Sequence, residues 1–305
     1  MFTYTLDNKR YHTFNYFLKN RFNTKVFKIA LDANFSCPNK KSGGCIYCLE
    51  GSKSNITNNN IDVIKQFEEE KKIMHQKWPV GKYIPYLQAN TNTLDTVENL
   101  KKIYEPLINM DNIVGLAIAT RPDSISDEVL DYLNDINKRT FLMVELGLQS
   151  CHDETLKYIN RGHDAKCFAD MVKKLKEKNI FVVAHIINGL PGETKEMMIE
   201  TAKYLNDLHI DAVKIHMLHI VKNTKLAKIY EERPFKVLTK DEYIDIVCEQ
   251  LTYLDPKIVI ERITGDPIKE ELIEPKWLIK KFVLLNDIDK EMKKRNYYQG
   301  IRCNQ

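Results

Sequence analysis

The sequence has no long apolar segment. Its 305 residues contain no run of about eighteen apolar side chains, the length that would span a bilayer. The first residues, MFTYTLDNKRYHTF, also lack the apolar core of a secretory signal peptide. Seven cysteines are an odd number without paired spacing, which argues against a secreted protein built on disulfides. We therefore expect a cytoplasmic protein without a membrane partner.

A second metal-binding motif is also missing. Cys151, Cys167, Cys248 and Cys303 are scattered, and no second Cys-x2-Cys or His-x3-His follows the first cysteine group. A closed structural zinc site needs four tetrahedral ligands. The sequence therefore does not favour a zinc finger.

Three cysteines do lie close together, in the stretch NFSCPNKKSGGCIYC. They are Cys37, Cys45 and Cys48, in a Cys-x7-Cys-x2-Cys pattern directly after an apolar segment (26–31) that indicates a short buried strand. Proline and glycine in this loop let the backbone fold around a metal centre. Inert cysteines and a zinc site remain alternatives, but an iron-sulfur cluster on three thiolates would leave one iron open to an external ligand.

Short apolar runs alternate with helical patterns along most of the chain. Strands are predicted at 26–31, 83–88, 113–119, 141–146, 180–187 and 212–216, and helices at 61–78, 96–110, 127–137, 165–178 and 195–208. The polar stretch 51–60 predicts an exposed loop. This alternation implies an α/β fold with a parallel sheet, and six strands indicate a partial (β/α)6 barrel of the TIM type, open on one side.

Two additions flank the predicted barrel, which covers residues 26–220. Residues 1–25 form an N-terminal helical extension with an amphipathic helix at 11–22. Residues 221–305 form a C-terminal cap packed on the barrel, with helices near 225–231 and 239–254, a short strand at 258–263 and a final helical stretch at 275–295.

Polar residues follow the predicted strands, where loops of a parallel barrel converge on one rim. They are Gln88, Asn90, Thr91, Asn92, Thr120, Arg121, Asp123, Glu145, Gln149, residues 188–193, His216 and His219. Glu145 lies in an apolar strand and is costly to bury alone; a polar contact to a bound molecule is favoured over a structural salt bridge. His216 and His219, with Arg262 and Asp266 of ERITGD, are the candidate catalytic residues.

Several segments together resemble radical S-adenosylmethionine (SAM) enzymes. FSCPN, GGCIYC, QANTNT, GLAIATRPD, ELGLQS, INRGHD, NGLPGET, KIHMLHIVKNTKLA and ITGD are similar to the YhcC/YtqA family, itself related to the radical SAM domain of the Elongator catalytic subunit. The likeness extends from about Arg10 to Gly300. It implies a 4Fe-4S cluster on the three cysteines, cleavage of SAM to a 5'-deoxyadenosyl radical, and a reductase such as flavodoxin or ferredoxin as electron donor.

The resemblance also implies a set of SAM-binding residues. They are Tyr47, Gln88, Thr91, Asn92, Glu145, Gln149, Arg161, Ile187 and Gly189. The sequence departs from the superfamily in two places. Seven residues separate the first two cysteines where three is usual, and QANTNT occupies the place where Gly-Gly-Glu often holds the methionine amine. Amide and hydroxyl groups would then bind that amine.

The distribution of charge bears on the substrate. Residues 1–30 and 276–305 each carry a net charge of +5, whereas the whole chain carries only +4. Basic ends suit a polyanion, although lysine-rich surfaces also serve solubility alone. The resemblance implies tRNA, with conversion of the wobble 5-carboxymethylaminomethyl-uridine to 5-aminomethyl-uridine. Two alternatives remain: a radical SAM enzyme for a small metabolite or protein side chain, and a non-enzymatic zinc or electron-transfer protein.

Overall fold

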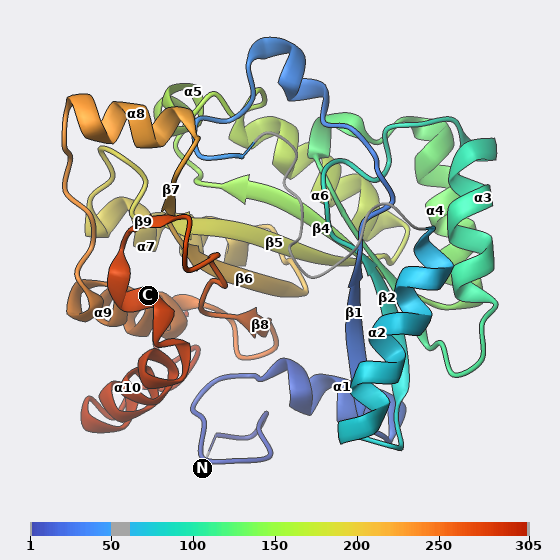
Figure 1. Ribbon diagram of the computed structural model, residues 1–305. Helices are drawn as coiled ribbons and strands as arrows, with labels where there is room; N and C mark the ends of the chain where they lie inside the picture. Colours follow the sequence, from blue (N-terminus) through green and yellow to red (C-terminus); the bar gives the residue numbers. More distant parts are fainter. Residues whose placement is uncertain (1, 50–61, 304–305) are drawn as a thin grey trace.

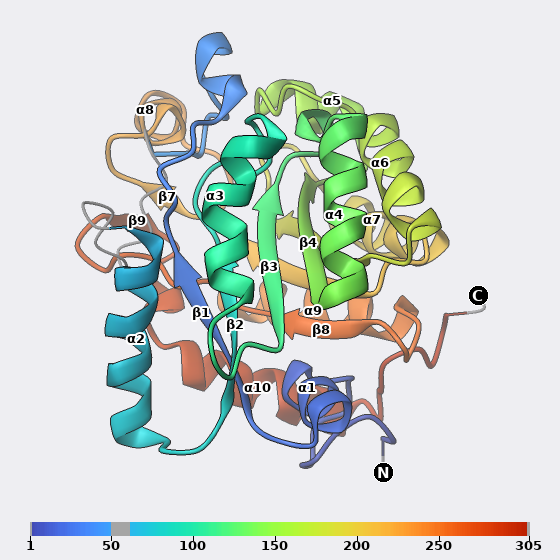
Figure 2. The ribbon, with the colours of Figure 1, turned by 90° about the vertical axis from the view of Figure 1, so that its right-hand side faces the viewer.

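The computed structural model describes residues 2–49 and 62–303, so the loop expected at 51–60 lies outside the described residues. Seven parallel strands form one sheet in the order β1-β2-β3-β4-β5-β6-β8. The sheet curls, and helices cover its outer face (Figures 1 and 2). This arrangement confirms the expected α/β partial barrel. In the part of the chain that is described, no helix is both long and apolar enough to cross a membrane.

The barrel strands alternate with helices as the sequence predicts. The strands are β1 (Val26–Leu31), β2 (Lys82–Leu87), β3 (Gly115–Thr120), β4 (Phe141–Gln149), β5 (Phe181–Asn188), β6 (Ala212–Met217), β7 (Ile220–Val221), β8 (Val259–Arg262) and β9 (Leu272–Glu274). The helices are α1 (Phe14–Phe22), α2 (Val63–Lys77), α3 (Val97–Ile108), α4 (Asp127–Arg139), α5 (Asp153–Tyr158), α6 (Ala165–Glu177), α7 (Lys195–Asp207), α8 (Lys225–Glu232), α9 (Lys240–Tyr253) and α10 (Lys281–Lys294).

The strand predicted at 258–263 has an unexpected position. It forms as β8 and pairs in parallel with β6, so it extends the barrel sheet to a seventh strand. The short pair β7 and β9 was not predicted and is antiparallel. The domain boundary placed after residue 220 stays a prediction, although a strand from beyond it completes the sheet.

Most helices begin at a residue that accepts a backbone N–H with its side chain. These capping residues are Thr96, Ser126, Asp164, Thr194, Thr224 and Thr239. Such a cap satisfies one of the free N–H groups of the first turn and stabilises the helix by roughly 1 kcal/mol. Thr239 forms a full capping box with Glu242. Thr13 and Asp62 cap α1 and α2 in the same way, so most helix starts are defined by the local sequence.

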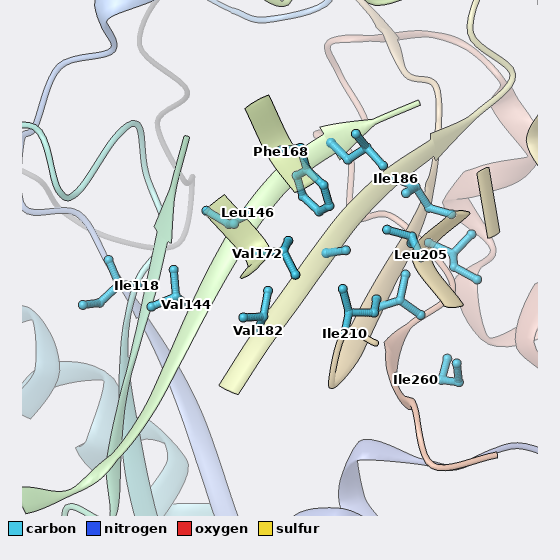
Figure 3. Close-up of a cluster of buried hydrophobic side chains, with 14 of the residues drawn as sticks. Ile118, Val144, Leu146, Phe168, Val172, Val182, Ile186, Leu205, Ile210 and Ile260 are labelled. Carbon is cyan, nitrogen blue, oxygen red and sulfur yellow. The ribbon is translucent and has the colours of Figure 1, made fainter. Parts of the chain in front are cut away.

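The main core lies between the sheet and its outer helices. In Figure 3, Val144 and Val182 of the central strands lie near Phe168 and Val172 of α6. Phe168, Val144 and Val182 are completely buried. Eight of the nine residues of β4 are buried, because helices cover one face of this strand and the barrel interior covers the other.

Helix α1 closes the amino-terminal end of the barrel interior (Figures 1 and 2). Leu18 is buried among inward-facing strand residues. The Phe17 ring packs on Phe181, with 5.0 Å between centroids, and on Phe141, with 6.0 Å. This apolar plug leaves the carboxyl ends of the strands as the open end of the barrel.

Candidate active site

The three cysteines line one cavity at the carboxyl ends of the strands, with a volume of about 960 Å³. This is near the upper limit for small-molecule sites, roughly 300–1,000 Å³. Backbone hydrogen bonds hold the cysteine loop: Ile46 N–H donates to Ile159 O at 3.0 Å, and Leu226 N–H donates to Ile46 O at 2.8 Å. The loop therefore lies against the end of α5 and the start of α8, as Figure 1 shows in blue.

Cys45 is the buried member of the three. Its sulfur accepts hydrogen bonds from Asn39 Nδ2 at 3.4 Å and from Arg161 Nη1 at 3.9 Å. A hydrogen bond from the Cys48 thiol and the nearby Arg161 guanidinium lower the pKa of Cys45 to about 5, although burial opposes them. Cys45 is therefore a thiolate at neutral pH, the form that binds metals.

Arg161 is held in place by the backbone of β4. Its Nη2 and Nε donate to Gly147 O at 2.7 and 3.3 Å. A Cβ at position 147 would lie only 2.6 Å from Arg161 Nη2 and 2.6 Å from Gln149 Nε2. Glycine at this position therefore allows the guanidinium to reach both the strand and the Cys45 sulfur.

The substitution Gly147→Ala tests this close approach. The added methyl group is expected to displace Arg161 and to lower the free energy of unfolding by about 1–3 kcal/mol, the usual cost of overpacking. Retained iron after anaerobic reconstitution should fall as well, measured per protein chain. Gly192→Ala is the control for a general loss of stability: its Cβ would meet nothing within 4 Å, but φ at this position is +88°, so alanine is strained there and should destabilise the fold without removing iron. Equal iron retention in the two variants would contradict the proposed role of Arg161.

Glu145 is the centre of a charged cluster below the cysteines. Its Oε2 accepts from Tyr86 Oη at 2.5 Å, Lys214 Nζ at 2.7 Å and His185 Nε2 at 2.8 Å, and its Oε1 accepts from Lys28. Burial alone would raise the pKa of Glu145, but Lys214, Lys28 and His185 outweigh it and hold that pKa well below the usual range. The structure therefore gives Glu145 the salt-bridge role that the sequence ranked second, and its contact with SAM stays a prediction.

Glu261 of β8 completes this group, which we call the floor cluster: Lys28, Tyr86, Glu145, His185, Lys214 and Glu261. Glu261 pairs with Lys28 at 2.6 Å and with Lys214 at 3.1 Å. Because Lys28 lies on β1 and Glu261 on β8, the cluster joins the two free edges of the sheet across its open side. The sequence analysis counted Lys28 among the basic residues of the N-terminus; in the structure it is an internal ion-pair partner.

His216 lies beside the floor cluster and lines the cavity. Its ring stacks on His185, with 5.7 Å between centroids. Burial, followed by the nearby His185 and Arg262, lowers the pKa of His216 well below its usual value. His216 is therefore a neutral group, and its Nε2 has no hydrogen-bond partner among the described residues.

His219 and Asp266 do not line the cavity. Burial lowers the pKa of His219 to about 4, with opposing influences from Asp266 and Arg262. Asp266 pairs with Arg262 at 3.1 Å and with Lys281 of α10 at 2.7 Å. Asp266 therefore positions Arg262, which does line the cavity.

The low pKa of His219 predicts acid lability. The unfolded chain binds a proton at this histidine near pH 6.5, whereas the folded chain binds it only near pH 4, so the free energy of unfolding falls as pH drops through this range. In the His219→Gln variant the free energy of unfolding should depend less steeply on pH. The slope should decrease by up to one bound proton, which corresponds to about 1.4 kcal/mol per pH unit. Urea unfolding at several pH values measures the slope. His75→Gln, at an exposed position of α2, is the control, and an unchanged slope in His219→Gln would refute the prediction.

The structure brings most of the expected site residues to this cavity. Its lining includes Cys37, Cys45, Tyr47, Cys48, Gln88, Thr91, Glu145, Gln149, Arg161, His216 and Arg262. Asn92, Ile187 and Gly189 are not among the lining residues. Asn92 Nδ2 donates to three backbone carbonyls, of Leu87, Ala89 and Ala119, at 2.8–3.0 Å, so this amide joins β2 to β3. Contact of these three residues with SAM stays a prediction.

Sequence reasoning missed several lining residues. They are Lys40, Tyr86, His185, Lys214, Asn223, Thr224, Lys225 and Lys228, among others. Lys214 in AVKIHM and Lys28 in VFKIAL carried the same signal as Glu145, a charged residue inside an apolar strand. The exposed lysines carried no local signal that distinguishes them from other surface residues.

Comparison with known proteins places this site in a family. Residues 36–205 match the Radical SAM superfamily, and residues 210–294 match the Radical_SAM C-terminal domain. The chain belongs to the radical SAM superfamily. This radical SAM protein is 46% identical to the uncharacterized protein YtqA of Bacillus subtilis (strain 168), over 98% of this chain and 94% of YtqA. It is 31% identical to YhcC of Escherichia coli (strain K12), over 90% and 89% of the two chains. It therefore belongs to the YhcC/YtqA family.

More distant relatives are larger proteins. The radical SAM protein is 27% identical to a tRNA uridine(34) acetyltransferase of Methanocaldococcus infernus, over 76% of this chain and 42% of the relative. The solved structure of Methanocaldococcus infernus Elp3 with an N-terminal deletion superposes with a TM-score of 0.70 at 20% identity, over 90% of this chain and 64% of that chain. At that identity, the structural likeness supports the fold only.

Membership of this superfamily implies a 4Fe-4S cluster and SAM. The cavity fits both. Its lining supplies three thiols, the ligand number that leaves one iron of such a cluster open to an external ligand. Thr91 also lines the cavity, and its Oγ1 is buried without a hydrogen-bond partner among the described residues. An unsatisfied buried polar atom costs about 1–3 kcal/mol, which a ligand's hydrogen bond would recover.

Proposed function

We propose that this radical SAM enzyme modifies tRNA at the wobble uridine, converting 5-carboxymethylaminomethyl-uridine to 5-aminomethyl-uridine. The observation that carries the proposal is the cavity itself, which extends from the three cysteines to Arg262 and whose volume of about 960 Å³ is near the upper end for small-molecule sites. A relative named tRNA uridine(34) acetyltransferase supports the same nucleotide. That relative is more than twice as long as the matched region, so its acetyl transfer is not proposed here.

The cysteines and the groups around them would hold the cofactors. Cys37, Cys45 and Cys48 would bind the 4Fe-4S cluster, and Thr91 would offer a hydrogen bond to SAM. When bound, these cofactors supply a 5'-deoxyadenosyl radical that abstracts a hydrogen atom from the substrate. After the hydrogen bond from Cys48, the Arg161 guanidinium also lowers the pKa of Cys45. Helix α1 keeps water from entering through the other end of the barrel.

Two lining residues suit the side chain of the proposed nucleotide. The Arg262 guanidinium can bind a carboxylate in a bidentate manner, and Asp266 restricts its orientation. His216 is kept neutral by burial, so its Nε2 can exchange a hydrogen bond or a proton with the substrate amine. The candidate catalytic residues His216 and Arg262 would therefore contact the substrate, and Asp266 would position Arg262.

The test is an anaerobic assay of the reconstituted enzyme with SAM and dithionite, with and without tRNA from cells that lack this protein. Mass spectrometry would follow 5'-deoxyadenosine and the modified nucleosides. We expect 5'-deoxyadenosine together with a tRNA-dependent loss of 5-carboxymethylaminomethyl-uridine and a gain of 5-aminomethyl-uridine. 5'-Deoxyadenosine with unaltered tRNA would assign the enzyme to a small metabolite or a protein side chain. A protein that binds zinc, or a loaded cluster that does not cleave SAM, would favour the non-enzymatic alternative.

A further inference from the structure

Three lysines line the cavity between the cysteine loop and α8. We call Lys40, Lys225 and Lys228 the mouth lysines; all three are exposed and line the same cavity as the cysteines. None has a carboxylate within ion-pairing distance among the described residues. The mouth of the cavity therefore carries three positive charges that no carboxylate within residues 2–49 and 62–303 neutralises.

The mouth lysines are attached to a fixed backbone. Leu226 N–H of α8 donates to Ile46 O of the cysteine loop at 2.8 Å. A Cβ at Gly43 would lie 2.5 Å from Lys225 Nζ, so this ammonium lies directly on the cysteine loop. Thr224 caps the first turn of α8, and the positive end of the helix dipole adds to the charge of Lys225 and Lys228.

The basic ends of the chain are less available than the mouth lysines for binding a polyanion. Lys9 pairs with Asp289, Lys28 with Glu261, Arg295 with Asp245 and Arg302 with Glu249, at 2.5–2.6 Å. These contacts neutralise much of the charge that the sequence suggested for binding a polyanion. The mouth lysines provide such charge beside the cavity instead.

We infer that the mouth lysines bind the phosphates next to the target nucleotide of an RNA substrate, while its base enters the cavity. This inference rests on the proposed function. Phosphate contacts fix the position of a nucleic acid, and enzymes that act on a base take it out of the stack into a pocket. The three lysines line the cavity that the base would enter, where their positive charge favours the adjacent phosphates.

The experiment compares the reconstituted wild-type protein with Lys40→Gln, Lys225→Gln, Lys228→Gln and the triple variant. Binding of tRNA from cells that lack this protein is measured by fluorescence anisotropy at several salt concentrations. The triple variant is expected to bind tRNA 10- to 100-fold more weakly. The slope of log K against log salt should become shallower by about 0.7–0.9 for each lysine removed, because fewer counterions are released. Iron content and thermal midpoint verify that the variants are folded and loaded.

Lys173→Gln is the matched control, because Lys173 is an exposed residue of α6 outside the cavity. It should leave both affinity and salt slope unchanged. Wild-type protein that does not bind tRNA would reject the proposed function. Wild-type binding with equal binding by the triple variant would overturn the inference alone. Normal tRNA binding with slower reduction of the cluster by flavodoxin, but not by dithionite, would assign the lysines to the electron donor and overturn it as well.

Discussion

Replacing Cys37, Cys45 or Cys48 by serine is expected to reduce SAM cleavage by more than about 100-fold. The described part of the cavity offers three thiols to the cluster, so each substitution removes a ligand that no other lining cysteine replaces. Loss of a group that merely supports a metal ligand already costs roughly 10- to 100-fold. Iron and sulfide content, the visible absorption of the cluster and the yield of 5'-deoxyadenosine would measure the effect.

Cys151→Ser and Cys167→Ser provide the controls. Both cysteines are partly buried, as Cys37 is, but neither lines the cavity. Their variants should retain iron and cleave SAM like the wild-type protein. A fully loaded and active Cys48→Ser variant would show that the three cysteines do not act as one ligand set.

Glu145→Gln is expected to lower the free energy of unfolding by about 3–5 kcal/mol, the usual cost of removing one partner from a buried ion pair. The substitution leaves the ammonium groups of Lys28 and Lys214 with Glu261 as their only carboxylate in the floor cluster. Because the folded pKa of Glu145 lies well below that of the unfolded chain, its contribution is present at neutral pH and is lost as pH falls through the folded pKa. Urea unfolding of the apoprotein at neutral and acidic pH measures both effects.

Glu105→Gln is the matched control for this prediction. Glu105 pairs with Arg139 at 2.6 Å, but the two side chains are 30% and 41% exposed. An exposed ion pair contributes about 1 kcal/mol or less, so this variant should lose little stability. Equal losses in Glu105→Gln and Glu145→Gln would mean that the floor cluster does not stabilise the fold through its charges.

The sequence predicted the barrel well because its signals are local. Apolar runs, helix caps and the cysteine motif each occupy a few consecutive residues, and the predicted strands and helices formed within a few residues of their expected ends. The position of β8 depends instead on pairing with β6, which is far away in the sequence. No periodicity within 258–263 distinguishes a strand of the barrel from a strand of a cap.

The distinction between local sequence signals and contacts of distant residues also applies to the site. Glu145, Lys28 and Lys214 each attract notice as charged residues inside apolar strands, but only the curled sheet shows that they are partners. The support of Cys45 by Arg161 likewise depends on the absence of a side chain at Gly147 of β4. Contacts of this kind join residues more than ten positions apart, so no single motif contains them.

The floor cluster forms part of the cavity wall and also ties β1 to β8 across the open side of the sheet. The same side chains of Glu145 and Lys214 therefore shape the cavity and hold the sheet together. Few substitutions should be tolerated at these two positions, because a mutation that changes the shape of the cavity also destabilises the barrel. The mouth lysines line the cavity without an ion pair among the described residues. Homologues that adapt to new substrates are expected to diverge first at those outer positions, and an alignment of enzymes with measured substrates would reveal that gradient.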